Sequence, residues 1–397
     1  MSLREEVIAL ESRHIVQTYR RASFVLDRGE GVYLFDTDGR RYLDFSAGIA
    51  VNALGYGDPE VMEVIRDQAA HYFHVSNLYH SEPMARLAKT LTDLSFADRV
   101  FFCNSGAEAN EGAIKFARKW GRSGGQDRHE IVVFTGAFHG RTMGALTATP
   151  REAYQAAFRP LIGGINVARF NDLDSTAQAI TPKTCAIMVE PIQGEGGIHP
   201  ASVEFMQGLR RLCDEHDLLL VLDEVQCGLG RTGRLWAHEA YGIKPDIMTL
   251  AKPLGGGLPM GAVLVTERVA AAIAPGDHGS TFAANALISR VAQVVVNRVS
   301  RPEFLKQVSE VGEYLGASLR RLAERKANAA ETRGDGLMWA LELTDDAAPY
   351  VEKGYSEGLI MLVAGAKVLR FLPPLVIGKE HVDELIQILD RVLPDKV

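Results

Sequence analysis

Two short apolar runs, each followed at once by a charged residue, constrain the fold of this chain more than any other feature. Residues 218–222 are followed by Asp223, and residues 247–251 are followed by Lys252. A continuous apolar run of this length, bounded by turn residues, is typical of a strand that is buried on both faces of a parallel sheet. Ligands of open α/β sheets bind at the carboxyl ends of the strands. The two runs therefore predict that a carboxylate and an amine lie in one crevice.

Segments with strand-like and helix-like patterns alternate around these two runs. Such alternation, with short links, indicates an α/β fold with a mostly parallel sheet wrapped by helices. The expected strands span residues 99–104, 130–134, 185–191, 218–222, 247–251 and 261–266. The expected helices span residues 2–16, 59–74, 83–94, 108–120 and 203–215.

The pattern changes after about residue 285, where we expect a smaller α+β domain. Near the N-terminus, Asp38-Gly39 between two β-rich runs predicts a hairpin. The C-terminal helices are expected at residues 286–299, 304–326 and 381–393, and the strands at 338–343 and 368–374. The chain is too long for one small core, so we divide it into three parts. These are an N-terminal segment that joins the small domain, a large domain and the small domain, at residues 1–50, 51–285 and 286–397.

Charge and hydropathy argue against several classes of protein. The net charge of -7 and the lack of a long basic run argue against nucleic-acid binding. No apolar run approaches the ~20 residues of a membrane span. The first residues carry acids and no apolar signal region, so we expect a cytoplasmic protein. The cysteines show no CxxC spacing, which favours buried thiols in a reducing compartment: Cys103, Cys185, Cys213 and Cys227.

Three patterns suggest other chemistries but fail on their context. Residues 228–233 are GLGRTG, which fits the nicotinamide fingerprint G-x-G-x-x-G. That fingerprint should follow a strand directly and open a helix, whereas here DEVQC intervenes. The acid of LLLVLDE resembles a Mg²⁺ ligand of nucleotide hydrolases, but no GxxxxGK[ST] loop accompanies it. No histidines have metal-ligand spacing, so we expect no metal and interpret four of them as surface or supporting residues: His71, His74, His80 and His139.

A helix start and an aromatic turn can each hold part of a ligand. Ser105 and Gly106 lie between an expected strand and an expected helix, where free N–H groups and the helix dipole favour an anion. The alternative is a plain helix cap with Glu108. In GAFHGRT, Phe138 can lie flat against a planar ring and Arg141 can bind a carboxylate. The alternative is a turn with a buried phenylalanine and a solvated arginine.

Lys252 and Asp223 add an amine and an acid to this set. A lysine is ordinarily a solvated surface charge, but Lys252 precedes PLGGG, whose glycines allow a ligand to approach closely. A desolvated lysine loses its proton more easily and becomes a better Schiff-base nucleophile. Asp223 needs a cationic partner, which a protonated pyridine nitrogen or a buried arginine or lysine can supply equally well. Pyridoxal phosphate has a phosphate, a flat ring, a basic nitrogen and an aldehyde, and it therefore uses all four features.

Six ordered stretches carry a family resemblance: SGAEAN, FHGRT, VEPIQGEGG, LDEVQCGLGRTG, LAKPLGGGLPMGA and HGSTFAAN. Together they resemble the class III aminotransferases, the ω-amino acid and ornithine branch of fold-type I pyridoxal-phosphate enzymes. The resemblance covers nearly the whole chain. It implies a large domain with a mostly parallel seven-stranded sheet between helices, and a smaller α+β domain. The chain departs from the family in GDGLMWALEL, where Trp339 and Leu341 are bulkier than expected, and we expect both to pack the small domain.

The resemblance implies a set of cofactor contacts. Lys252 would form the Schiff base and shuttle a proton, and Asp223 would keep the pyridine nitrogen protonated. Phe138 and Val225 would stack on the two ring faces, and Gln226 would hydrogen-bond the ring hydroxyl. The phosphate would be held by Ser105, Gly106 and Ala107, and the site completed from the neighbouring subunit by Thr281 with Ser280. The family thus implies a homodimer with shared active sites.

The same resemblance implies a set of substrate contacts. Arg141 matches the family residue that grips one carboxylate, and Arg370 matches the residue that grips the α-carboxylate of glutamate. Glu195 matches the gate that pairs with the second arginine when the amine donor is bound. Tyr19 is expected to border the substrate, and Gly48 to leave space for an acyl group.

The reaction that the resemblance implies belongs to arginine biosynthesis. It moves the terminal amino group of N2-acetyl-L-ornithine to 2-oxoglutarate by a ping-pong mechanism, giving N-acetylglutamate 5-semialdehyde and L-glutamate. Alternatives with the same chemistry use succinylornithine, ornithine, succinyl-diaminopimelate or 4-aminobutyrate. Two others are a non-transaminating fold-type I enzyme and a catalytically silent cofactor-binding protein. Lys252 and the two arginines weigh against the silent protein.

Overall fold

A seven-stranded sheet forms the centre of the fold in the computed structural model, which describes residues 1–396. The strand order is β4-β12-β11-β10-β7-β5-β6. All neighbours are parallel except for β12, which runs antiparallel to β4 and β11. The mostly parallel sheet predicted from the sequence is therefore confirmed. Its strands are β4 (Arg99–Cys103), β5 (Glu130–Phe134), β6 (Ile165–Ala168), β7 (Thr184–Val189), β10 (Leu219–Asp223), β11 (Ile247–Leu250) and β12 (Gly261–Val265).

The sequence analysis predicts six of these seven strands and misses β6. This strand has four residues and lies at the edge of the sheet, where only its last residue is buried. An edge strand that is partly exposed lacks the continuous apolar run by which the central strands are recognised. The sequence pattern also does not reveal that β12 runs antiparallel to its neighbours. A strand buried on both faces is apolar whichever way it runs.

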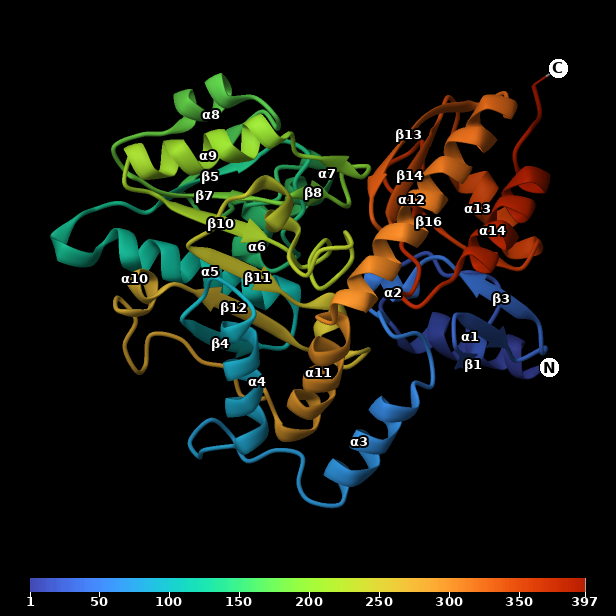
Figure 1. Ribbon diagram of the computed structural model, residues 1–397, viewed down its shortest axis with the longest axis horizontal. Helices are drawn as coiled ribbons and strands as arrows, with labels where there is room; N and C mark the ends of the chain where they lie inside the picture. The colour runs from blue at the N-terminus through green and yellow to red at the C-terminus, as the bar shows by residue number, and fades with distance from the viewer. Residues whose placement is uncertain (397) are drawn as a thin grey trace.

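Two helical layers cover the faces of this sheet (Figure 1). Along β10, Leu219 and Val221 pack in the layer of α5 (Gly106–Gly121), whereas Leu220 and Leu222 pack in the layer of α9 (Val203–Glu215). Both faces of the strand are thus buried, which explains why the whole run is apolar. The carboxyl edge of the sheet remains free for polar groups. The helix α8 (Leu173–Ala179) lies beside α9.

Three helices pack together beyond the edge of the sheet that carries β4 (Figure 1). They are α3 (Pro59–Ala69), α4 (Glu82–Asp93) and α11 (Ala286–Val299), and α11 packs against both of the others. The predicted helix 59–74 was too long, because α3 ends at Ala69 and the chain turns there. Tyr72 and Phe73, which extend the apolar pattern, are exposed after the turn. The boundary placed at residues 285 and 286 stays a prediction.

The C-terminal part combines helices with a second sheet, as expected. This sheet has the order β13-β14-β17-β16, and the sequence analysis misses both of its outer strands. Trp339 and Leu341 of β14 are buried in the hydrophobic cluster there, so their predicted packing role is confirmed. The elements are α12 (Pro302–Arg325), β13 (Ala329–Asp335), β14 (Met338–Leu343), α13 (Ala348–Ser356), β16 (Leu362–Val363), β17 (Val368–Phe371) and α14 (Lys379–Val392).

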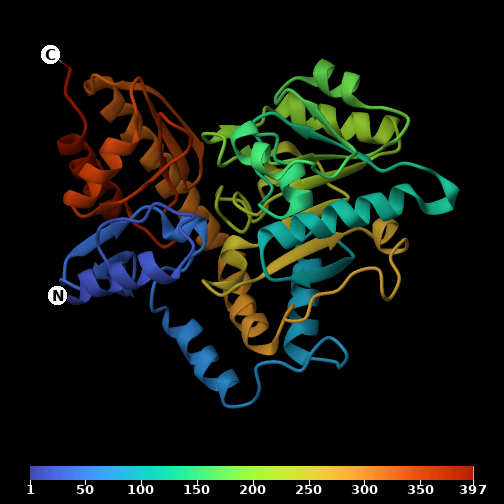
Figure 2. The same cartoon turned by 180° about the vertical axis from the view of Figure 1, so that it is seen from behind.

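The N-terminal segment joins the C-terminal part through a third sheet (Figure 2). Its strand β3 (Arg41–Asp44) pairs antiparallel with β2 (Tyr33–Asp36), as Asp38-Gly39 predicts, and parallel with β15 (Leu359–Ile360). Gly39 has φ 83°, a conformation that glycine adopts readily in a tight turn. The remaining elements of the fold are α1 (Leu3–His14), β1 (Leu26–Glu30), α2 (Ala47–Ala50), α6 (Met143–Thr147), α7 (Glu152–Gln155), β8 (Ile192–Gln193), β9 (His199–Pro200) and α10 (Glu267–Ala270).

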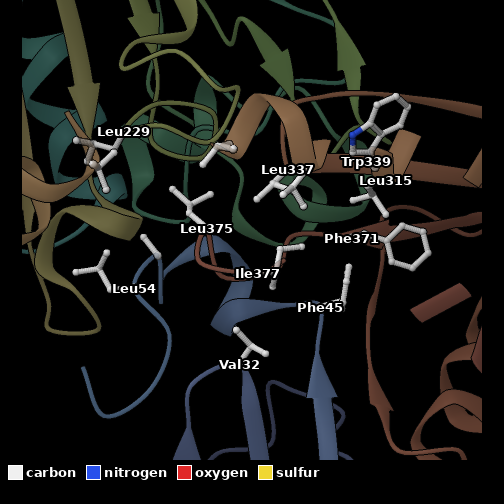
Figure 3. Close-up of a cluster of buried hydrophobic side chains, with 14 of the residues drawn as sticks. Val32, Phe45, Leu54, Leu229, Leu315, Leu337, Trp339, Phe371, Leu375 and Ile377 are labelled. Carbon is white, nitrogen blue, oxygen red and sulfur yellow. The ribbon is translucent and has the colours of Figure 1, made fainter. Parts of the chain in front are cut away.

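One hydrophobic cluster connects these parts (Figure 3). It contains Phe45 from the N-terminal segment, Leu229 from the GLGRTG loop, and Leu315, Trp339 and Phe371 from the C-terminal part. Packing of this kind fixes the loops that follow β10 against the strand β17. The position of β17 relative to the carboxyl edge of the large sheet is consequently set by the core.

Several classes of special feature are absent from residues 1–396. No helix there combines the length and the apolar composition that crossing a membrane requires. No group of three or more metal-ligating side chains is arranged to hold a metal ion in the same residues. The cysteines are buried and unpaired, as their spacing predicts: Cys103, Cys185, Cys213 and Cys227.

Candidate active site

A cavity of about 450 Å³ opens at the carboxyl ends of β10 and β11. Asp223 and Lys252 both line it, so the crevice predicted from the two apolar runs exists. Seven further predicted site residues also line this cavity: Ser105, Gly106, Ala107, Phe138, Arg141, Val225 and Gln226. The tertiary structure therefore brings together residues from four separate stretches of the sequence.

Asp223 is buried and its carboxylate accepts three hydrogen bonds. Oδ2 accepts one from Nδ1 of His139 at 2.7 Å and one from Nδ2 of Asn110 at 2.8 Å. Oδ1 accepts one from the backbone N–H of Val225 at 3.0 Å. Asn110 is itself oriented by Thr249, which donates to its Oδ1 at 2.8 Å. The carboxylate is thereby fixed in position at the floor of the cavity.

His139 supports Asp223 from the side away from solvent. Burial alone would lower the pKa of His139, but the hydrogen bond and the charge of Asp223 outweigh burial and raise it. The interpretation of four histidines as surface or supporting residues is confirmed, because the other three are exposed: His71, His74 and His80. The sequence analysis did not connect His139 or Asn110 with Asp223.

A second buried acid, Glu190, joins two loops at the cavity. Its Oε1 accepts from the backbone N–H of Phe138 at 2.8 Å, and its Oε2 accepts from that of Gly194 at 3.2 Å. Burial raises the pKa of this carboxyl. The sequence analysis misses Glu190 as a site residue, although it follows the apolar run of β7 just as Asp223 ends that of β10.

Lys252 begins a short 3₁₀ helix directly after β11, with its side chain in the cavity. Burial lowers its pKa to about 8, although the negative charge of Glu195 opposes the shift. An amine with this pKa is unprotonated in part of the molecules near neutral pH, as nucleophilic attack requires. The local environment therefore suits the role that the sequence predicts for Lys252.

The N-terminus of α5 has the features of an anion site and of a capped helix at once. Ser105 caps it, since its Oγ accepts from the backbone N–H of Glu108 at 3.2 Å. Within residues 1–396, the backbone N–H groups of Gly106 and Ala107 have no acceptor and remain available to an anion. A Cβ on Gly106 would lie only 2.7 Å from Cγ1 of Val225. The two interpretations of this stretch are therefore compatible.

Arg370 and Glu195 form an ion pair beside the cavity. Nη1 of Arg370 is 2.5 Å from Oε1 of Glu195 and donates also to the carbonyl of Gly194 at 3.3 Å. Burial opposes ionisation of Glu195, but the positive charges of Arg370 and Lys252 outweigh it and lower the pKa. Gln226 lies next to this pair, with Nε2 3.5 Å from Oε1 of Glu195. The acid and arginine predicted to pair are thus in contact.

Six residues that the sequence analysis assigned to the site do not line this cavity: Glu195 and Arg370, which pair beside it, and four further residues. Tyr19 is 75% exposed, and Thr281 is exposed as well. Ser280 accepts a hydrogen bond from Asn104 next to the start of α5, outside the lining. Gly48 has φ 63° and lies near the lining residue Val51 without joining it. Within a single chain, these four residues therefore do not border the cavity.

Comparison with known proteins identifies the family. Residues 15–393 match the family of class III aminotransferases. The chain belongs to the class III aminotransferases.

Relatives and solved structures agree with this membership. The chain is 49% identical to the mitochondrial acetylornithine aminotransferase of Alnus glutinosa, over 98% of this chain and 88% of that protein. It is 46% identical to the succinylornithine transaminase of Yersinia pseudotuberculosis, over 93% and 92% respectively. The crystal structure of the ornithine aminotransferase from Toxoplasma gondii superposes with a TM-score of 0.94 at 29% identity, over 99% of this chain and 95% of that one. The fold is thus that of fold-type I aminotransferases.

Pyridoxal phosphate is the cofactor of class III aminotransferases, and the cavity fits it. The free N–H groups of α5 suit its phosphate, and Phe138 and Val225 stand on the cavity wall where a flat ring can lie. Asp223 supplies an acid and Lys252 an amine within the same cavity. The GLGRTG loop opens no α-helix, and its glycines Gly230 and Gly233 have φ 85° and 79°, which is turn geometry.

Proposed function

We propose that this aminotransferase moves the terminal amino group of N2-acetyl-L-ornithine to 2-oxoglutarate, giving N-acetylglutamate 5-semialdehyde and L-glutamate. The state of two arginines carries this proposal: Arg141 lines the cavity, and Arg370 lies beside it. Arg370 is neutralised by Glu195, whereas Arg141 has no acidic partner among residues 1–396. With Arg370 paired, the site offers one guanidinium to a donor with one carboxylate. When Glu195 withdraws, two arginines match the two carboxylates of 2-oxoglutarate.

The residues of the chain have separate tasks in this reaction. When bound, pyridoxal phosphate supplies an aldehyde and an electron-withdrawing ring. Lys252, with its lowered pKa, takes up and returns the proton at Nζ. Asp223, fixed by His139 and Asn110, would hold the pyridine nitrogen in its protonated form. Phe138 and Val225 would hold the ring between them, and Gln226 would hydrogen-bond its hydroxyl.

Succinylornithine is the second candidate donor, because the relative from Yersinia pseudotuberculosis named for it covers nearly the whole chain. The two donors differ only in the acyl group, whereas both carry the same terminal amine and α-carboxylate. The succinyl group adds a methylene and a second carboxylate, and a pocket contact that distinguishes one methylene is worth only ~1–3 kcal/mol. We expect the acyl group near Gly48, where the backbone has no side chain to fill the space.

We also propose that the enzyme is a homodimer with shared active sites. Ser280 and Thr281 do not line their own chain's cavity, and Asn77 donates to the carbonyl of Ser280 at 3.0 Å. The surface beside them is apolar, with Leu78 87% and Phe282 62% exposed. A partner covering this surface would receive Thr281 at its phosphate site.

The cytoplasmic location stays a prediction, since the relative from Alnus glutinosa is named as mitochondrial.

A half-reaction screen over amine donors tests the proposed specificity. The purified enzyme with its cofactor is mixed with acetylornithine, succinylornithine, ornithine, succinyl-diaminopimelate or 4-aminobutyrate, and the loss of the visible cofactor band is followed. We expect acetylornithine to give the highest second-order rate constant for loss of the cofactor band, with succinylornithine next. A faster reaction with ornithine or 4-aminobutyrate would contradict the proposed substrate. Bleaching with none of the donors would favour the silent cofactor-binding protein.

A further inference from the structure

The guanidinium of Arg141 is held by an aromatic ring. Its Cζ lies 3.6 Å from the centroid of the Tyr154 ring and 5.7 Å from that of Phe138. Among residues 1–396 it has no hydrogen-bond or ion-pair partner. The N–H donors of Arg141 are therefore free for a ligand, while the ring of Tyr154 lies against the guanidinium.

Side-chain hydrogen bonds hold both ends of the short segment that carries Tyr154. Arg151 donates from Nη2 to the carbonyl of Gly136 at 2.6 Å, from Nε to that of Ala137 at 3.2 Å and from Nη1 to that of Glu195 at 3.1 Å. Gln155 donates from Nε2 to the carbonyls of Leu146 at 3.0 Å, Thr147 at 3.3 Å and Thr149 at 2.8 Å. Tyr154 lies between these anchors and is half-buried. The ring of Tyr154 is consequently a fixed platform against which the Arg141 side chain packs.

The position of this platform links both carboxylate sites. Arg151 bonds the loop that carries Phe138 and, through the Glu195 carbonyl, the loop that faces Arg370. Phe138 meets Tyr154 edge to face, with 6.2 Å between ring centroids and an interplanar angle of 84°. The distance from Arg141 to Arg370 is therefore set by the segment 151–155 together with the core.

We propose that Tyr154 is a positioning residue for substrate carboxylates, which acts by stacking on Arg141. The inference rests on the proposed function, in which Arg141 binds the carboxylate. An arginine side chain has several rotamers, and ordering it on binding weakens the affinity. A ring that already holds the guanidinium lowers this cost, and the contact itself is favourable because the ring face is negative. Without the ring, the guanidinium of Arg141 can turn away from the orientation in which it binds a carboxylate.

The test measures binding of glutarate, which has two carboxylates and cannot be transaminated. Calorimetry with the cofactor-loaded enzyme compares the wild type with Tyr154→Leu, Tyr154→Phe and Arg141→Ala. Tyr154→Met serves as a second ring-less variant if Tyr154→Leu does not fold. Phe158→Leu is the matched control, because Phe158 is 57% exposed and lies four residues along the chain. The affinity for pyridoxal phosphate is measured for each variant as well.

We expect Tyr154→Leu to weaken glutarate binding about threefold to thirtyfold, the factor expected for a cation–π contact at a partly desolvated site. Tyr154→Phe and Phe158→Leu should bind glutarate as the wild type does, and cofactor affinity should stay unchanged in all of them. In a protein that already carries Arg141→Ala, Tyr154→Leu should cause no further loss of glutarate affinity. For the donor, KM should rise in Tyr154→Leu while kcat changes little.

Two results would overturn the inference. One is wild-type glutarate affinity in Tyr154→Leu while Arg141→Ala binds weakly. The other is a loss in Tyr154→Leu that persists in full when Arg141 is already alanine. If Arg141→Ala itself binds glutarate as the wild type does, the role of Arg141 in the proposed function fails instead, so the two failures are distinguishable.

Discussion

Asp223 and Lys252 occupy neighbouring strand ends but are controlled by different physical effects. Asp223 is surrounded by donors from His139 and Asn110, which fix the direction of its carboxylate. Lys252 has no such network, and burial lowers its pKa to about 8. At the scale of single residues, the site thus combines an acid held by hydrogen bonds with an amine made reactive by desolvation.

The lowered pKa of Lys252 predicts its reactivity in the protein without cofactor. At pH 7 roughly a tenth of a lysine with this pKa is unprotonated, about three hundredfold more than for an ordinary lysine. Competitive labelling with acetic anhydride between pH 6 and pH 10, read by mass spectrometry of the peptide, should give a midpoint near 8. The exposed Lys367 is the control for the efficiency of labelling. A midpoint above 10 for Lys252 would contradict the prediction.

The lowered pKa of Lys252 also makes the free energy of unfolding depend on pH. Between about pH 8 and the ordinary lysine pKa of 10.5, the unfolded chain binds the proton of Lys252 more tightly than the folded chain does. This residue therefore makes the free energy of unfolding of the cofactor-free protein rise with pH in that window. Lys252→Met should remove this contribution.

The pair of Arg370 and Glu195 predicts a difference between the two half-reactions. Arg370→Ala should slow the reaction with glutamate by about tenfold to a hundredfold, the loss expected for a charged hydrogen bond to the second carboxylate. The acetylornithine half-reaction should fall less, because in the proposed reaction Glu195 stays paired with Arg370 while that donor is bound. Stopped-flow measurement of the cofactor band separates the two, with Lys367→Ala as the control. Equal losses would argue against a gate formed by Glu195.

At the scale of elements, α12 shows how packing can override helix propensity. Gly316 lies in its middle, where alanine would normally stabilise a helix by ~1 kcal/mol. The ring of Trp339 from β14 covers Gly316, and a Cβ there would collide with it. Trp339, the bulky departure from the family pattern, is thus accommodated by a glycine on the facing helix.

We therefore expect Gly316→Ala to destabilise the protein. Overpacking of a filled core costs ~1–3 kcal/mol, which exceeds the gain in helix propensity. The midpoint of urea unfolding should shift to lower denaturant, whereas Glu313→Ala at an exposed site of the same helix should shift little. The double variant Gly316→Ala/Trp339→Leu should recover part of the loss. An increase in stability for Gly316→Ala alone would contradict this prediction and show that the ring of Trp339 can shift to make room for the added methyl group.

At the scale of the whole molecule, the exposed apolar surface near Thr281 predicts self-association. Sedimentation equilibrium should give twice the chain mass of 43.4 kDa. Phe282→Asp should shift the protein towards the monomer and weaken retention of the cofactor, because a charge is costly in an apolar interface. Phe158→Asp, at a similarly exposed position, is the control. A monomeric wild type that retains full activity would refute the shared site.

Local patterns in the sequence predict much of the fold and the centre of the site. The apolar runs of β7, β10 and β11 identify buried strands, because a strand covered on both faces needs apolar side chains at every position. The serine and glutamate at the start of α5 predict a capped helix, and the hairpin of β2 and β3 follows from Asp38-Gly39. These features depend on neighbours in the chain. Asp223, Lys252 and the start of α5 could therefore be assigned to one crevice before the structure.

Contacts between distant residues were decided by the tertiary structure alone. His139 reaches Asp223 across 84 positions, and Arg370 reaches Glu195 across 175. The resemblance to the family anticipates the second pair, but nothing in the pattern predicts the first, or Tyr154 under Arg141. Such contacts depend on how the layers pack against the sheet and on the core that joins β17 to the loops after β10. The sequence by itself determined which chemical groups the strands deliver, and packing determined which of them meet.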